Sequence, residues 1–208
     1  TSFGNKCFDG CSSLTSITIP NSVESLGDEC FNNCTSLTSI EIPSSVTSLE
    51  GYCFNGCRSL TSITIGNSVK SLGEYCFSNC TSLTSIEIPS SVTSLDEYCF
   101  SNCTSLTSIT LGANIPNGCF YRCHALNYVA LSNKVQTIGS RAFYECSNLR
   151  SLTFTSGNSI TLVGSEAFSN SGITQFLGFA LLREISTKAF YNCTSLSKVS
   201  FADKEIGS

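Results

Sequence analysis

Apolar residues recur along this chain in one unit that is repeated nine times. In a typical copy Leu83 is followed by Ile86 and Ile88, with one polar residue between the isoleucines, and then by Val92 and Leu95. Each copy also holds one phenylalanine of a column that reads Phe8, Phe31, Phe54, Phe77, Phe100, Phe120, Phe143, Phe168 and Phe190. These phenylalanines are 20 to 25 residues apart, a period typical of a solenoid of stacked coils. We therefore expect a single solenoid domain over residues 1–208, without linkers.

The Ile-x-Ile step predicts a short β-strand. Its residues are β-branched and alternate with period two, so Ile86 and Ile88 would face the core while Glu87 faces solvent. Nine such strands, stacked at the usual spacing of ~4.8 Å, form a parallel sheet about 40 Å long. We expect this sheet to be a single curved layer on one face of the solenoid.

The segment around each phenylalanine predicts one or two turns of helix. Asp28 and Glu29 precede Phe31 where a helix dipole favours acidic residues. Two residues after the phenylalanine, seven of nine copies carry Gly or Asn, which is typical of a left-handed residue that ends a helix. This column reads Gly10, Asn33, Gly56, Asn79, Asn102, Arg122, Glu145, Asn170 and Asn192. The fold class expected is therefore an α/β repeat solenoid, with a parallel β-sheet on one face and short helices or turns on the other.

The composition narrows the possible functions. Charged residues make up only 12% of the chain, the net charge is −4 and the pI is near 5.0. This balance excludes a surface built mainly to neutralise phosphates, so we expect no nucleic-acid partner. Apolar runs fall short of the roughly 18 residues that a membrane helix needs, so we expect no membrane insertion. The N-terminal residues show no signal peptide.

All fourteen cysteines fall into two columns that flank the phenylalanine. The first column is Cys7, Cys30, Cys53, Cys76, Cys99 and Cys119, and the second is Cys11, Cys34, Cys57, Cys80, Cys103, Cys123, Cys146 and Cys193. Such a pattern is compatible with core packing, with disulfides or with metal ligation. Three copies replace the first-column cysteine by Ala142, Ala167 and Ala189, which keep an apolar side chain but cannot ligate a metal. We therefore favour packing, and expect no metal and no cofactor.

Candidate catalytic residues are few. His124 adjoins Cys123, but it stands at a variable position and is interpreted as a surface residue. Glu41 and Glu87 would lie two coils, roughly 10 Å, apart, near the separation of an inverting glycosidase pair. On a flat exposed sheet without a pocket they are better interpreted as solvated surface. No catalytic residue is therefore assigned.

The run from Leu83 to Cys103 (LTSIEIPSSVTSLDEYCFSNC) resembles the repeat of BspA-like leucine-rich-repeat proteins, and the resemblance extends over nearly the whole chain. It implies a leucine-rich-repeat horseshoe of the kind found in bacterial and protozoan surface proteins linked with adhesion and host-factor binding. It also implies that the chain is not an enzyme. The Cys-rich form of the repeat is similar to the protozoan members.

The resemblance also bears on location. It implies a cell-surface or extracellular protein, with a cytoplasmic protein as the alternative. Four Asn-Cys-Thr triplets, at Asn33, Asn79, Asn102 and Asn192, satisfy the N-glycosylation pattern but are equally explained by the helix stop and the cysteine column. Because Phe3 and Gly4 correspond to the middle of a repeat, we expect a fragment of a longer array.

Three hypotheses of function remain, and the third is an enzyme, for which no catalytic residue is assigned. In the first, the chain is a protein-interaction or adhesion module that binds a host or extracellular protein through its strand face and adjacent loops. In the second, it is a structural spacer or self-assembling repeat element. The Tyr and Arg residues of the later copies are typical of binding surfaces, and we assign partner binding to Tyr121, Tyr128 and Arg150. The oligomeric state is left open.

Overall fold

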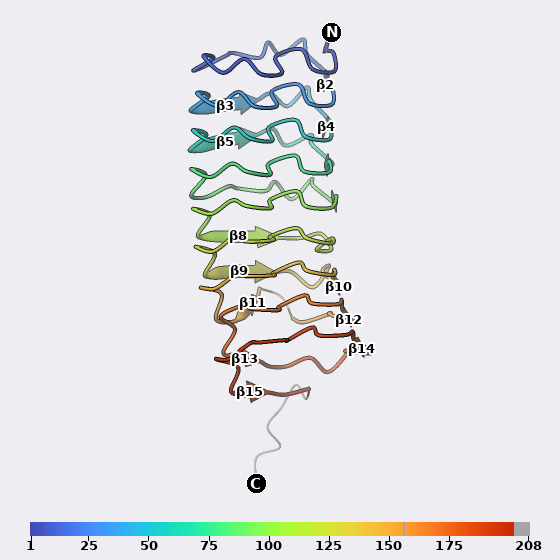
Figure 1. Ribbon diagram of the computed structural model, residues 1–208. Coiled ribbons are helices and arrows are strands. Elements are labelled where there is room, and N and C mark those ends of the chain that lie inside the picture. The colour runs from blue at the N-terminus through green and yellow to red at the C-terminus, as the bar shows by residue number, and fades with distance from the viewer. Residues whose placement is uncertain (156, 202–208) are drawn as a thin grey trace.

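The computed structural model describes residues 1–155 and 157–201, and its coils stack one on another along a single axis (Figure 1). Among the described residues, seven of the nine Ile-x-Ile steps form the predicted parallel strands, and they lie in three sheets rather than in a single one. These strands are β3 (Ser39–Ile42), β5 (Ser62–Ile65), β8 (Ser108–Leu111), β9 (Tyr128–Leu131), β11 (Leu152–Phe154), β13 (Gln175–Phe176) and β15 (Lys198–Val199). Equivalent residues pair directly, as Glu41 does with Thr64, so the register follows the repeat. The parallel solenoid is confirmed.

A second parallel ladder runs along another side of the stack. It forms from the last inward apolar residue before each anchor segment, which is leucine in the regular copies, and the residue before it, for which no strand was predicted. Its strands are β1 (Ser2–Phe3), β2 (Ser25–Leu26), β4 (Ser48–Leu49), β6 (Ser71–Leu72), β7 (Ser94–Leu95), β10 (Thr137–Ile138), β12 (Leu162–Val163) and β14 (Glu184–Ile185). Coils are thus tied to one another on two sides of the stack, although each ladder is divided into separate sheets.

The predicted helices are wrong: over the described residues no helix forms, and the segment around each phenylalanine is a series of turns. Residues on both sides of the phenylalanine have positive φ, such as Glu29 at 55° and Asn33 at 56°. A right-handed helix cannot pass through two such residues. The Phe31 N–H instead donates to the Cys53 carbonyl of the next coil at 2.8 Å. These segments, called anchor turns below, therefore hydrogen-bond between coils rather than within one coil.

A stack of phenylalanine rings forms the centre of the core. Phe31, Phe54 and Phe77 are fully buried, and neighbouring rings along the column are nearly parallel, with centroids 5.1 to 5.6 Å apart. Leucine, isoleucine and valine side chains from every coil pack around this stack in one continuous cluster. The predicted inward phenylalanine column is confirmed.

The cysteines are free thiols, and eleven of the fourteen are buried in this core, whereas Cys7 and Cys11 are exposed and Cys193 is partly buried. Those of the second column have a further role, because each one after Cys11 donates a hydrogen bond to the phenylalanine carbonyl of the preceding coil. The Cys80 Sγ, for example, lies 3.2 Å from the Phe54 oxygen and that of Cys103 lies 3.1 Å from the Phe77 oxygen. No such bond is found for the described first-column thiols, which agrees with their replacement by alanine in three copies. Core packing is therefore the role that the structure supports.

Candidate functional site

The outward residues of the strands follow directly from the alternation in each copy. Ile40 and Ile42 point inward and are buried, so Glu41 between them must point to solvent. The same rule places Thr64 and Glu87 on the outside of the following coils. Because equivalent residues are stacked, these side chains form one column along the strand face, in which Thr and Glu alternate from Thr18 to Thr110.

A groove runs along this column. Its central hollow has a volume of about 590 Å³ and extends over three coils, from Glu41 past Thr64 to Glu87. A hollow of about 350 Å³ adjoins it at Glu41, and one of about 360 Å³ adjoins it at Glu87 and reaches Tyr128. The prediction of a flat sheet without a pocket is therefore wrong. We call this continuous hollow the strand-face groove.

The central hollow of the groove lies where the strand ladder is interrupted. β3 pairs with β5, but the following Ile-x-Ile step, residues 85–88, is not a strand and joins the next sheet only through the bridge from Ser85 to Ser108. Among the described residues, no backbone hydrogen bond links β5 to residues 84–88. The second ladder remains closed at the same level, since β6 pairs with β7. At this level the strand face therefore lacks the backbone pairing that the second ladder keeps, and backbone groups of the described residues there are left without a partner in the neighbouring coil.

The two carboxylates of the groove are unpaired. No ion pair or side-chain hydrogen bond is found for Glu41 or Glu87 in the part of the chain that the structure describes. Acidic residues of the anchor turns behave differently: Glu145 and Glu166 lie 2.9 and 2.6 Å from arginine Nε atoms of the preceding coil. Negative charge on the anchor turns is thus partly neutralised within the protein, whereas that of the groove is available to a ligand.

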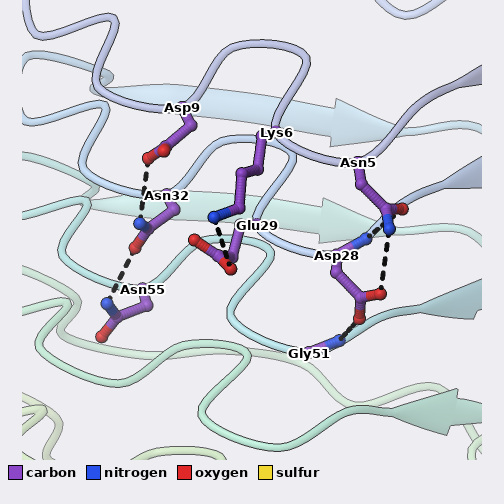
Figure 2. Close-up of polar contacts among 8 residues, drawn as sticks. All are labelled: Asn5, Lys6, Asp9, Asp28, Glu29, Asn32, Gly51 and Asn55. Atoms are coloured by element: carbon purple, nitrogen blue, oxygen red, sulfur yellow. Dashed lines mark hydrogen bonds and ion pairs between the residues drawn. The ribbon is translucent and has the colours of Figure 1, made fainter.

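Polar side chains also link the anchor turns of neighbouring coils (Figure 2). Amide groups form a chain in which Asn32 donates to Asp9 at 2.9 Å and Asn55 donates to Asn32 at 2.8 Å. Beside it, Lys6 forms an ion pair with Glu29 at 3.3 Å. Because these polar groups satisfy one another, we interpret this part of the surface as structural.

Tyrosine rings continue this structural surface in the middle of the chain. Tyr75 stacks on Tyr52 and on Tyr98 with ring centroids 4.8 and 4.9 Å apart, and Tyr121 stacks on Tyr144 at 5.1 Å. Tyr98 and Tyr121 meet edge to face at 6.4 Å, so five rings form one row. The sequence analysis did not find this row, because its members come from two different positions of the repeat.

The three residues assigned to partner binding are not brought together at one place. Tyr128 begins β9, is 46% exposed and lines the end of the groove. Tyr121 belongs instead to the tyrosine row of the anchor turns. Arg150 is exposed just before β11 and donates to the Gly172 carbonyl at 3.0 Å. Tyr128 is thus the member that joins the groove.

The other candidate residues occupy ordinary positions. His124 is exposed, with its Nδ1 2.9 Å from the Glu145 carbonyl, while the adjacent Cys123 is buried. Of the four glycosylation triplets, Asn79 and Asn192 donate their amide groups to asparagine side chains of the preceding coil. Within the described residues no group of three or more potential metal ligands is found, and no helix there is long and apolar enough to span a membrane.

Comparison with known proteins places this solenoid in a family. A T. pallidum leucine-rich-repeat protein, TpLRR, is 31% identical over 71% of this chain and 71% of its own, with a TM-score of 0.67. The pneumococcal vaccine antigen PcpA shares the fold at 15% identity, over 98% of this chain and 71% of its own, with a TM-score of 0.52. No curated protein matches the chain. The sequence pattern of the BspA-type leucine-rich-repeat region, in six copies, matches residues 1–117 and 113–208. The chain therefore belongs to the BspA-type leucine-rich-repeat family.

Proposed function

We propose that this chain is a non-enzymatic module that binds a protein ligand along the strand-face groove. The observation that carries the proposal is the continuity of the groove, whose central hollow shares Glu41 with one neighbouring hollow and Glu87 with the other. A long, shallow, polar surface suits a segment of protein chain better than a small molecule, which usually binds in an enclosed and largely apolar pocket. Leucine-rich repeats of this family commonly occur in surface and interaction proteins.

The groove gives little support to catalysis. Glu41 and Glu87 are both exposed, and neither has a neighbouring group that orients it for proton transfer. Leucine-rich-repeat folds are in general non-enzymatic, which agrees with this proposal. A cell-surface or extracellular location, with a role in adhesion, belongs to the same proposal.

Of the residues assigned from the sequence, Tyr128 is proposed to contact the ligand directly. Its exposed ring closes one end of the groove and offers the large aromatic surface that binding sites favour. Arg150 stands one copy further on, close to the start of the next strand, and is proposed to extend the site. Tyr121 lies among the anchor turns, where it would contact only a ligand that wraps around the solenoid.

The test is a binding screen of the chain, immobilised intact, against a panel of purified cell-surface and extracellular proteins. Each protein that binds is then measured against Thr64→Arg, which places a long side chain in the centre of the groove. Thr93→Arg is the matched control, because Thr93 is exposed beside β7 on the second ladder. Loss of binding with Thr64→Arg but not with Thr93→Arg supports the proposal. Equal binding to both variants would overturn it.

A further inference from the structure

We infer that the strand-face groove takes an extended cationic segment of protein chain, in which two Lys or Arg side chains three residues apart pair with Glu41 and Glu87. This inference rests on the proposed function and adds the chemistry and the conformation of the partner. It commits to a polyproline II segment, which has three residues per turn and no internal hydrogen bonds.

The sign of the charge comes from the lining of the groove. The three hollows contain two carboxylates and no lysine or arginine. Both carboxylates lack an ion-pair partner among the described residues, although other acidic side chains of the solenoid have one. A ligand with two positive charges would complement this surface, and a negatively charged ligand would be repelled from it.

The conformation comes from the spacing. Glu41 and Glu87 are two coils apart, about 10 Å at the usual distance between parallel strands. In a polyproline II segment, residues i and i+3 lie on the same side and about 9.3 Å apart, which matches two coils. In a β-strand, by contrast, same-side residues are about 6.6 or 13 Å apart, and neither value matches.

The interrupted ladder distinguishes an extended segment from a helix. A helix could also present two cations about 10.5 Å apart, at i and i+7. However, its backbone groups are satisfied internally. In the described part of the chain, backbone groups of β5 and residues 85–88, which line the groove, lack partners in the neighbouring coil. A polyproline II segment keeps its own carbonyl groups free and can bond to such groups, and Asn21 and Asn67 at the rim add side-chain amides.

The experiment compares labelled proline-rich peptides of equal length by fluorescence anisotropy at low salt. One peptide carries two Arg at i and i+3, a second carries them at i and i+2, and a third carries Glu at i and i+3. A helical peptide with Arg at i and i+7 completes the set. We expect the first peptide to bind about fivefold more tightly than the second, because misplacing one cation removes one exposed ion pair. The acidic peptide should not bind, and added salt should lower the affinity of the peptide with Arg at i and i+3.

Variants of the chain locate the contact. Glu41→Gln and Glu87→Gln should each lower the affinity for the i, i+3 peptide about three- to fivefold, as expected for the loss of one exposed ion pair. Glu24→Gln is the control, since Glu24 is an exposed carboxylate outside the groove, and it should leave the affinity unchanged. Equal losses from all three variants, equal binding of the two arginine spacings, or preference for the helical peptide would each overturn the inference.

The inference and the proposed function can fail separately. If a protein from the screen is blocked by Thr64→Arg but no spacing of arginines is preferred, the groove binds proteins and the inference is wrong. If the i, i+3 peptide binds as expected while the proteins of the screen bind the Thr64→Arg variant as tightly as the unchanged chain, the cationic site is supported and the proposed function is wrong.

Discussion

At the scale of single residues, stability depends on the phenylalanine stack. Phe77 is fully buried in the middle of the column, between two parallel rings with centroids 5.5 and 5.4 Å away. We predict that Phe77→Ala lowers the free energy of unfolding by about 3 to 5 kcal/mol, because it removes apolar contacts and leaves a cavity. Glu87→Ala, on the exposed face, should change it by less than about 0.5 kcal/mol. Equal shifts of the two variants in urea unfolding would contradict the assignment of the core.

The two cysteine columns should respond differently to alanine. Cys80 donates to the Phe54 carbonyl at 3.2 Å, whereas no such bond is found for Cys76, although both are buried. We predict that Cys80→Ala destabilises the protein by about 0.5 to 1 kcal/mol more than Cys76→Ala, the net value of one hydrogen bond. Chemical unfolding of both variants under reducing conditions measures the difference. A larger loss for Cys76→Ala would show that the thiol hydrogen bond contributes little.

At the scale of elements, the anchor turn depends on its two left-handed residues. The one that follows the phenylalanine was predictable, because Gly or Asn marks it in most copies. The one that precedes it was not, because Glu29, Tyr52 and Tyr98 occupy it and these residue types give no signal of positive φ. Acidic residues before the phenylalanine favoured a helix, but hydrogen bonds to the next coil prevailed over local preference.

Gly118 tests the packing of this element. It has a φ of +62°, and a Cβ atom there would come within contact distance of the Tyr98 ring. We predict that Gly118→Ala destabilises the protein by about 1 to 3 kcal/mol, through overpacking and through the left-handed backbone. Gly112→Ala is the control, since its Cβ would meet nothing closer than the Ser132 Oγ at 3.8 Å. Thermal unfolding midpoints that fall equally for both variants would contradict this account.

The groove could not be predicted from the sequence. Residues 85–88 repeat the SIEI sequence of β3 letter for letter, yet β3 pairs with its neighbour and residues 85–88 do not pair with β5. The opening depends on how successive coils stack and not on any local signal. Tyr128, by contrast, was recognisable as an aromatic residue at a position that most other copies fill with serine.

At the scale of the whole molecule, burial of many thiols predicts loss of stability at alkaline pH. Burial raises the pKa of Cys57 and of Cys103 to about 12, from an ordinary value of 9.0. The folded state therefore keeps these thiols protonated, while the unfolded chain releases their protons above pH 9. Stability is fully present below pH 9 and falls as the pH rises toward 12.

The size of this effect should be large. At pH 10 each fully buried thiol costs about 1.4 kcal/mol of stability, and the buried cysteines act together. We predict cooperative unfolding between about pH 9.5 and 11, followed by circular dichroism with a phosphine reductant present. A variant with Ala at Cys53, Cys76 and Cys99 has three fewer buried thiols. It should therefore lose less of its pH 7 stability at alkaline pH than the unchanged chain, so that, after correction for its stability at pH 7, its transition lies at higher pH. An unshifted transition would assign alkaline unfolding to other groups.

The strand face is the proposed binding surface, and hydrogen exchange measured with and without a saturating bound protein tests this proposal most directly. We predict slower exchange in β3, in β5 and in residues 85–89, which line the groove, with unchanged exchange in the anchor turns around Tyr98 and Tyr121. Protection confined to those anchor turns, with none in the groove, would contradict the account.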